Sequence, residues 1–167
     1  MKLTDIQISR LIKEPKFLEI TSPKEINQRT NINPDDYKII RFNLVLNGIE
    51  NRFRITWRQH VIYRTNFSIG LMYLPEQRNK GPYLKRYNGN HLGPHKNPIE
   101  KTEFQNVCHI HEATERYCNY QPKRGNKKYD IEHYAEPTNK YQTPEEAFRC
   151  LLADCNIKYP NNITKIW

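Results

Sequence analysis

The sequence predicts an α+β protein: an antiparallel β-sheet meander of about five to six strands, packed by a C-terminal amphipathic helix and preceded by a short N-terminal helix. Three observations indicate this class. Apolar and polar residues alternate through 40–73, as in a sheet covered on one face. Apolar residues recur at helical spacing within 4–14. A segment with a full set of helix start signals opens at Thr143.

The N-terminal helix is predicted over 4–14, with Thr4 as its cap and Pro15 as its end. Residues 15–37 are mixed and polar, and we interpret them as a connection with room for one helical turn. The chain is therefore expected to divide into 1–36 (N-terminal helix and connection), 37–157 (α+β core with the histidine site) and 158–167 (tail).

The central strands follow from period-two alternation. Residues 40–46 lead into Asn47-Gly48, a strong hairpin signal, and 52–58 form the return strand. A third run is predicted at Val61–Arg64 and a fourth at 67–73.

Residues 75–106 are rich in proline and glycine, and we interpret them as a long ordered loop of the kind that is usually functional. A fifth strand is expected at 107–113. A basic turn at 121–128 separates it from a sixth strand at Tyr129–Tyr134.

The final helix has the clearest signals. Thr143 is the expected N-cap, Pro144 the first helical residue and Glu146 the partner in a capping box. An apolar stripe ending at Cys155 predicts packing on the sheet, and Asn156 is the expected stop. We interpret Cys150 and Cys155 as structural.

Composition limits the class of protein. The 167 residues suit one domain. Lys and Arg outnumber Asp and Glu by 27 to 18, giving a net charge of +9, which favours acidic partners and argues against a DNA mimic. Four cysteines without a C-x-x-C motif exclude a disulfide scaffold. No stretch is long and apolar enough to span a bilayer, and the N-terminus does not read as a secretory signal, so we expect the cytoplasm of a bacterial host cell.

Four of the six histidines fall within 89–111. His109 and His111 are two apart in a predicted strand, so their side chains share a face. His95 lies in a Gly-Pro turn and can approach from a neighbouring element. Zinc prefers about four nitrogen or sulfur ligands. The sequence therefore predicts a structural zinc site of His95, His109, His111 and Cys118, with the fourth ligand left open between Cys118, Cys108, His91, His133, Glu112 and water.

The same histidines allow two other hypotheses. As an acid–base pair, His109 and His111 could cleave RNA in a toxin-type ribonuclease, with Arg116, Lys85 or Tyr117 holding the phosphate. Alternatively, the chain is a zinc-containing DNA-binding accessory protein.

Three clusters of basic and aromatic residues bracket the histidines, and interleaved Tyr and Arg can stack on bases or anchor a protein interface. They make nucleic acid a candidate ligand of the basic loops. Their members are Arg52, Arg54 and Arg58; Arg78, Lys80, Tyr83, Lys85, Arg86 and Tyr87; and Arg116, Tyr117, Tyr120, Lys123, Arg124, Lys127 and Lys128.

Over roughly 50–157 the chain resembles a family of small prokaryotic and prophage proteins. The matching pieces are Gly93-Pro94-His95-Lys96-Asn97-Pro98, His109-Ile110-His111, Glu115-Arg116-Tyr117 and the helix from Thr143 to Asn156. The resemblance implies that His95, His109 and His111 form one site.

Prophage proteins of this sort include zinc-carrying anti-CRISPR proteins without enzymatic activity, and toxin-like ribonucleases. The resemblance thus leads us to expect a metal-stabilised phage inhibitor, and it favours a non-enzymatic protein over an enzyme. Its expected partner is the protein surface of a host nucleoprotein defence complex, in particular a CRISPR effector such as Cas9. It would block nucleic-acid loading of that complex through protein–protein interaction.

Overall fold

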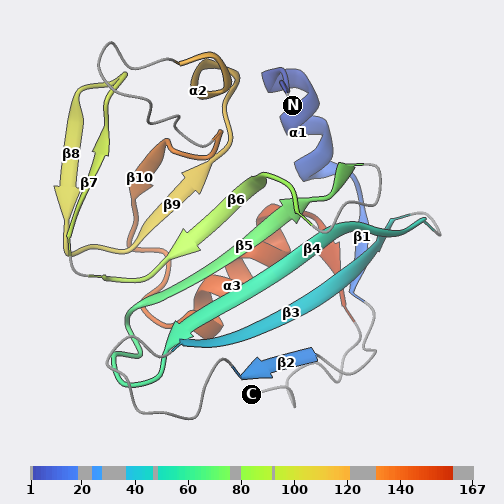
Figure 1. The fold of residues 1–167 in the computed structure, drawn as a ribbon, viewed down its shortest axis with the longest axis horizontal. Helices are drawn as coiled ribbons and strands as arrows, with labels where there is room; N and C mark the ends of the chain where they lie inside the picture. Colours follow the sequence, from blue (N-terminus) through green and yellow to red (C-terminus); the bar gives the residue numbers. More distant parts are fainter. Residues whose placement is uncertain are drawn as a thin grey trace.

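The computed structural model describes residues 2–18, 24–27, 37–46, 49–75, 80–91, 93–120 and 131–159. It confirms the predicted α+β class, with helices α1 (Asp5–Lys13), α2 (Glu115–Asn119) and α3 (Pro144–Asp154). Figure 1 shows α3 behind one large sheet, and α1 and α2 at its upper end.

The large sheet has the strand order β10-β9-β6-β5-β4-β3-β1-β11, and β2 also pairs with β3. Every pairing is antiparallel except that of β1 with β11. The strands are β1 Lys16–Leu18, β2 Lys24–Asn27, β3 Tyr37–Leu46, β4 Ile49–His60, β5 Phe67–Tyr73, β6 Tyr83–Asn88, β9 His109–Glu112, β10 Ala135–Pro137 and β11 Ile157–Lys158.

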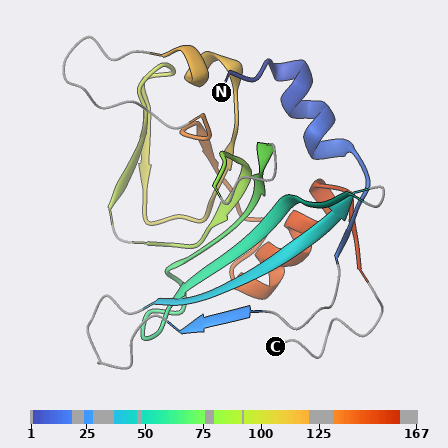
Figure 2. The same cartoon turned by 45° about the vertical axis from the view of Figure 1, so that its right-hand side comes forward.

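A separate two-stranded hairpin, β7 (Pro94–Asn97) and β8 (Thr102–Gln105), lies beside β9 and β10. Figure 2 shows it at the end of the sheet away from β1 and β3. The hairpin is what brings the Gly-Pro-His segment close to the histidines of β9.

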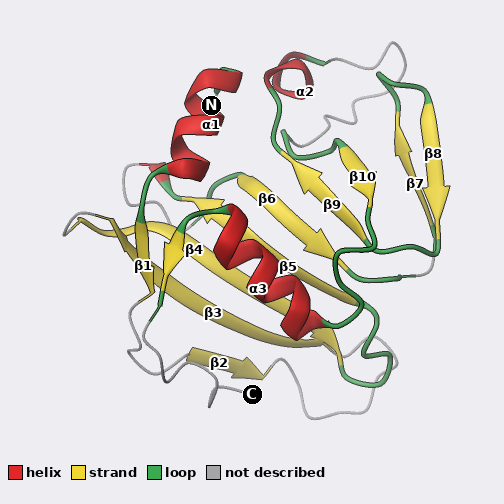
Figure 3. Ribbon diagram, turned by 180° about the vertical axis from the view of Figure 1, so that it is seen from behind, coloured by secondary structure: helices red, strands yellow, loops and turns green. Residues whose placement is uncertain are grey.

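The core lies between the sheet and α3, which crosses β5 in Figure 3. Alternation places Trp57, Ile69 and Tyr87 opposite one another on adjacent strands, all buried. The Trp57 and Phe148 rings are 5.7 Å apart, and the Tyr87 hydroxyl donates to Asp154 Oδ2 at 2.6 Å. The opposite face of the same strands is polar, as the alternation predicts.

The predicted helix signals are confirmed at both ends of the chain. Thr4 caps α1, and Thr143 and Glu146 form the capping box of α3 with Pro144 in its first turn. Asn156 follows α3 with a positive φ of 49°, the left-handed conformation that ends many helices.

Lys16 joins the ends of these two helices. Its side chain is fully buried, and Nζ donates to the carbonyl oxygens of Ile12 (2.9 Å), Glu14 (2.8 Å) and Cys155 (3.2 Å). Burial lowers the pKa of Lys16 to about 8. Carbonyls that a helix end leaves without partners are thereby satisfied by one ammonium group.

Three expectations about strands were wrong. Residues 61–64 form a turn whose Val61, Ile62 and Tyr63 are exposed, because the His60 ring accepts hydrogen bonds from the amides of Ile62 (3.1 Å) and Tyr63 (3.0 Å) and bends the chain. The predicted connection contains β1 and β2, and the predicted loop at 75–106 contains β6, β7 and β8. The count of five to six strands was too low because strands of two to six residues give little period-two signal.

The sixth strand begins later than predicted. Residues 131–132 form a turn, 133–134 have no regular secondary structure, and β10 begins at Ala135. The predicted Asn47-Gly48 turn, the basic turn at 121–128 and residues 129–130 lie outside the described residues, as does most of the predicted tail.

Candidate metal centre

His95, His109 and His111 form one group. His95 comes from β7, while His109 and His111 come from the same face of β9. One potential ligand nitrogen from each lies within 4.8 Å of the other two. His109 and His111 are buried and His95 is half-buried. This buried group can hold a metal ion.

The Gly-Pro-His-Lys-Asn segment positions His95. Gly93 adopts φ 112°, a conformation that other residues rarely adopt, and Pro94 then begins β7. His95 and Asn97 are two residues apart and so share a face of the strand. Asn97 is buried and attaches the hairpin to β10, because its amide donates to the Ala135 carbonyl (2.8 Å) and accepts from the Ala135 amide (3.0 Å).

The tautomer of His95 follows from that attachment. The Ala135 amide fixes Oδ1 of Asn97 as an acceptor, and His95 Nε2 lies 3.0 Å from this oxygen. Nε2 must therefore carry the proton and donate it. The lone pair of His95 is left on Nδ1, which is the nitrogen available to a metal.

His109 and His111 have the opposite tautomer. Nδ1 of His109 lies 3.0 Å from the carbonyl oxygen of Val107, and Nδ1 of His111 lies 2.9 Å from that of Glu132. Carbonyl oxygens only accept, so each Nδ1 carries the proton and each Nε2 offers a lone pair. Backbone carbonyls are common second partners of metal-binding histidines.

Burial keeps these imidazoles neutral. Burial is the largest cause of the lowered pKa in all three. The pKa of His109 falls to about 4, the pKa of His111 falls further, and the pKa of His95 falls below its usual value. The positive charge of Arg86 adds to the lowering for all three. A neutral imidazole is the form that binds a metal.

The spacing fits a metal after a small contraction. Zinc bound at about 2.0–2.1 Å by tetrahedral ligands requires nitrogens about 3.4 Å apart. The longest separation is at most 4.8 Å, so zinc binding would shorten it by at most about 1.4 Å.

Asn88 is a member of the site that the sequence did not indicate. It is 7% exposed, and its Nδ2 lies 3.2 Å from His109 Nε2 and 3.0 Å from His111 Nε2. Its Oδ1 is buried without a hydrogen-bond partner among the described residues. Rotating the amide by half a turn would bring Oδ1 to the two Nε2 atoms, where an oxygen can serve as a metal ligand.

Of Asn88 and Asn97, only Asn97 had a signal in the sequence. Asn97 lies two residues after His95, so period two predicts a shared face once β7 is known. Asn88 ends β6 opposite His109, a register that only the structure provides.

The structure does not bring Cys118 to the histidine group. Its thiol, on α2, contacts the Leu3 carbonyl oxygen at 3.6 Å and so serves the N-terminal segment. Cys108 is buried in the apolar core, and Glu112 pairs with Lys85 at 3.4 Å. Both lie on the other face of the chain at β9, as alternation requires for neighbours of His109 and His111.

Of the remaining histidines, His91 and His133 lie around the group, whereas His60 lies at the end of β4 beside Tyr63. The His91 and His109 rings are 5.0 Å apart, and His95 and His133 are 5.2 Å apart. His133 Nε2 is 3.0 Å from the Lys96 carbonyl oxygen, so that nitrogen is a donor.

The residues proposed to hold a phosphate in the ribonuclease hypothesis have structural partners. Arg116 pairs with Glu100 at 2.9 Å and lies 4.6 Å from the Tyr134 ring centroid. Tyr117 donates to Glu100 at 2.7 Å. Lys85 is occupied by Glu112 and by Asp154.

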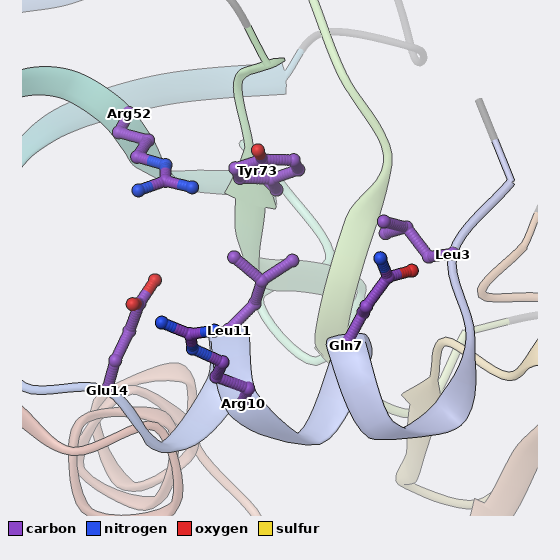
Figure 4. A pocket seen from close by; sticks show the side chains of 7 residues that line it. All are labelled: Leu3, Gln7, Arg10, Leu11, Glu14, Arg52 and Tyr73. Atoms are coloured by element: carbon purple, nitrogen blue, oxygen red, sulfur yellow. The ribbon is translucent and has the colours of Figure 1, made fainter.

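A cavity of about 230 Å³ lies between α1 and the sheet (Figure 4). Figure 4 shows Arg10 of α1 and Glu14, which follows α1, on one side and Arg52 and Tyr73 on the other, with Leu11 between them. Arg52 lies 5.6 Å from the Tyr73 ring centroid. This cavity has both signs of charge and shares no residue with the histidine group.

Comparison of the chain with family models, with curated proteins and with solved structures gave no match in any of the three. Within the described part of the chain, no helix has the length and apolar composition needed to cross a bilayer. The chemistry of the site therefore rests on its own geometry.

Proposed function

We propose that this protein binds one zinc ion through His95 Nδ1, His109 Nε2 and His111 Nε2, and that the ion ties the β7–β8 hairpin to the sheet. The observation that carries the proposal is the tautomer pattern. Each histidine gives one nitrogen to a fixed hydrogen-bond acceptor and keeps the other lone pair for the shared centre.

Zinc is the metal that these donors favour. Three neutral imidazoles suit zinc, copper, iron or nickel, whereas calcium and magnesium require oxygen ligands. A fourth position remains for Asn88 Oδ1, His91 or water. The role is structural, because the ion would link β7 to β9 in addition to the contacts that Asn97 makes with β10 and Glu100 makes with α2.

Acid–base catalysis by the same histidines has less support. A ribonuclease of this type needs one imidazole protonated near neutral pH to act as the acid. Burial lowers the pKa of His109 to about 4 and that of His111 further, so both imidazoles are neutral near pH 7. Arg116 is also engaged by Glu100.

The wider role that we propose is that of a non-enzymatic, phage-type inhibitor of a host nucleoprotein defence complex such as a Cas9 effector. Support comes from the sequence resemblance and from the net charge of +9, which suits an acidic protein face. Adding purified protein to a guide-loaded or unloaded Cas9 should slow target cleavage only when it is added before loading. Unchanged cleavage in both orders would reject this role, and cleavage of RNA by the protein alone would favour the ribonuclease.

Zinc content tests the site itself. Purified wild-type protein should carry about one zinc per chain by mass spectrometry, and His95→Ala or His111→Ala should lose most of it. His133→Gln is the matched control, because it removes a neighbouring histidine while keeping a donor for the Lys96 carbonyl, and it should retain zinc. Equal zinc loss in H133Q, or none in H95A, would contradict the assignment.

A further inference from the structure

A second, open cavity adjoins the histidine group on the polar face of the sheet. Its volume is about 270 Å³. We call it the arginine-lined cavity; its lining residues are Arg58, Asn66, Phe67, Ser68, Arg86, Asn88 and His91. It shares Asn88 with the metal site but extends away from it toward β4.

Strand register explains why these residues meet. Arg58 of β4 lies opposite Ser68 of β5, Ser68 opposite Asn88 of β6, and Asn88 opposite His109 of β9. The row of partners therefore runs directly into the metal site. It lies on the sheet face turned away from α3, the face toward the viewer in Figure 1.

The charge of the cavity has one sign. Arg58 and Arg86 contribute two guanidinium groups, and of the described residues that line the cavity none carries a carboxylate. Ser68, Asn66 and Asn88 add uncharged hydrogen-bonding groups. Guanidinium forks with neutral donors are the groups with which proteins bind phosphate.

Two residues that line the cavity each have a buried polar atom without a hydrogen-bond partner among the described residues: Nε of Arg86 and Oδ1 of Asn88. A buried donor without a partner is costly, and such groups are usually satisfied by a ligand or water. An anion in the cavity would accept from Arg86 Nε. If Asn88 turned its Oδ1 to a metal, its Nδ2 would be freed to donate as well.

We propose that the arginine-lined cavity binds a phosphate group, with Arg86 and Arg58 as its principal ligands. The phosphate is either free inorganic phosphate or a phosphodiester of a nucleic-acid strand that crosses the polar face. The inference goes beyond the zinc site, because the cavity needs no metal to hold an anion.

The test is a binding titration of purified protein with two probes, inorganic phosphate and an oligothymidine without terminal phosphates. Wild-type protein should bind at least one of them saturably. Binding of phosphate alone assigns a free phosphate, and binding of the oligonucleotide alone assigns a phosphodiester. Absence of saturable binding to both would overturn the proposal.

Variants identify the ligands. Arg86→Gln should weaken binding by about tenfold or more, because it removes a charged donor. Arg58→Gln, at an exposed residue, keeps the test decisive if R86Q does not fold. Arg64→Gln removes the same charge from the exposed β4–β5 turn, outside the cavity, and should bind as wild type. Equal weakening in R64Q would show that only net charge matters and would overturn the proposal.

The titration is repeated after zinc chelation and with H95A. Binding that persists in both supports the cavity whatever the outcome for zinc. Binding that vanishes on chelation, and that R86Q and R58Q leave unchanged in zinc-loaded protein, would place the phosphate on the metal and overturn the cavity assignment.

Discussion

Asn88 links the two proposed sites at the scale of single residues. Its Nδ2 lies within hydrogen-bonding distance of the Nε2 atoms of His109 and His111, and the same side chain lines the arginine-lined cavity. The amide therefore satisfies two histidine lone pairs when no metal is bound. A metal must displace its NH₂ group or exchange it for Oδ1.

Replacing Asn88 by Asp tests this arrangement. N88D should bind zinc at least tenfold more tightly, because a carboxylate becomes a fourth ligand. Without zinc its melting temperature should fall, because a buried carboxylate then lacks a partner. Competition with a chelator and thermal unfolding measure the two effects, and N88A separates loss of the amide from gain of charge. Weaker zinc binding by N88D than by N88A would contradict this role.

Tyr141 supports the site from the core side. Its hydroxyl lies 3.0 Å from the Asn88 carbonyl oxygen and 2.8 Å from that of His109, and it is buried. Tyr141→Phe should lower the free energy of unfolding by about 1 kcal/mol. That corresponds to a fall of about 2–4 °C in melting temperature for a chain of this size. Tyr159→Phe, at an exposed residue, is the control, and an equal effect there would refute the role of the Tyr141 hydroxyl.

Among the elements, the β7–β8 hairpin depends most on a few contacts. It forms its own two-stranded sheet, and the Asn97 amide joins it to the Ala135 backbone of β10 in both directions. Asn97 also accepts from His95 and donates to Thr102 Oγ1 at 3.0 Å. Asn97 thus helps to hold the hairpin, together with the contacts of Glu100 with Arg116 and Tyr117, and it sets the tautomer of His95.

Asn97→Ala should therefore affect both stability and metal binding. The loss of buried hydrogen bonds should cost about 1–3 kcal/mol, and zinc affinity should fall about 10–100-fold because His95 loses its partner. Lys96→Ala, which breaks an exposed ion pair with Glu103, should change neither by much. Chelator competition and denaturant unfolding distinguish the two variants. Unchanged zinc affinity in N97A would show that Asn97 does not orient His95.

At the scale of the whole molecule, the two faces of the sheet carry different kinds of residue. One face packs on α3 through Trp57, Ile69 and Tyr87, and supplies the apolar core. The other carries Arg58, Arg86 and the histidines, and the hairpin covers only the end near β9 and β10. A sheet covered on one side leaves the second face for binding.

This division was largely predictable from the sequence. Period-two alternation indicated the central strands, and the signals at Thr4 and Thr143 indicated both long helices. His109 and His111 were correctly placed on one face, and their joining by His95 was expected from the local motif. These predictions depended on residues that are close in the chain.

The rest depended on pairings between distant residues. The strands β1, β2 and β11 are too short to show a period, and their partners make them strands. Asn88 faces His109 through the β6–β9 register, and Cys118 is drawn to Leu3 by the packing of α2 beside the N-terminal segment. Val61–Tyr63 is apolar yet exposed, because the His60 ring sets a turn there.

The central claim is that one zinc ion joins the hairpin to the sheet. Amide hydrogen exchange of the wild-type protein, with one equivalent of zinc and after chelation, tests it most directly. Zinc should slow exchange in β7, β8 and β9 and leave α3 unchanged, because only the former elements meet at His95, His109 and His111. Equal exchange of the hairpin in both states, or protection spread evenly over the chain, would contradict the claim.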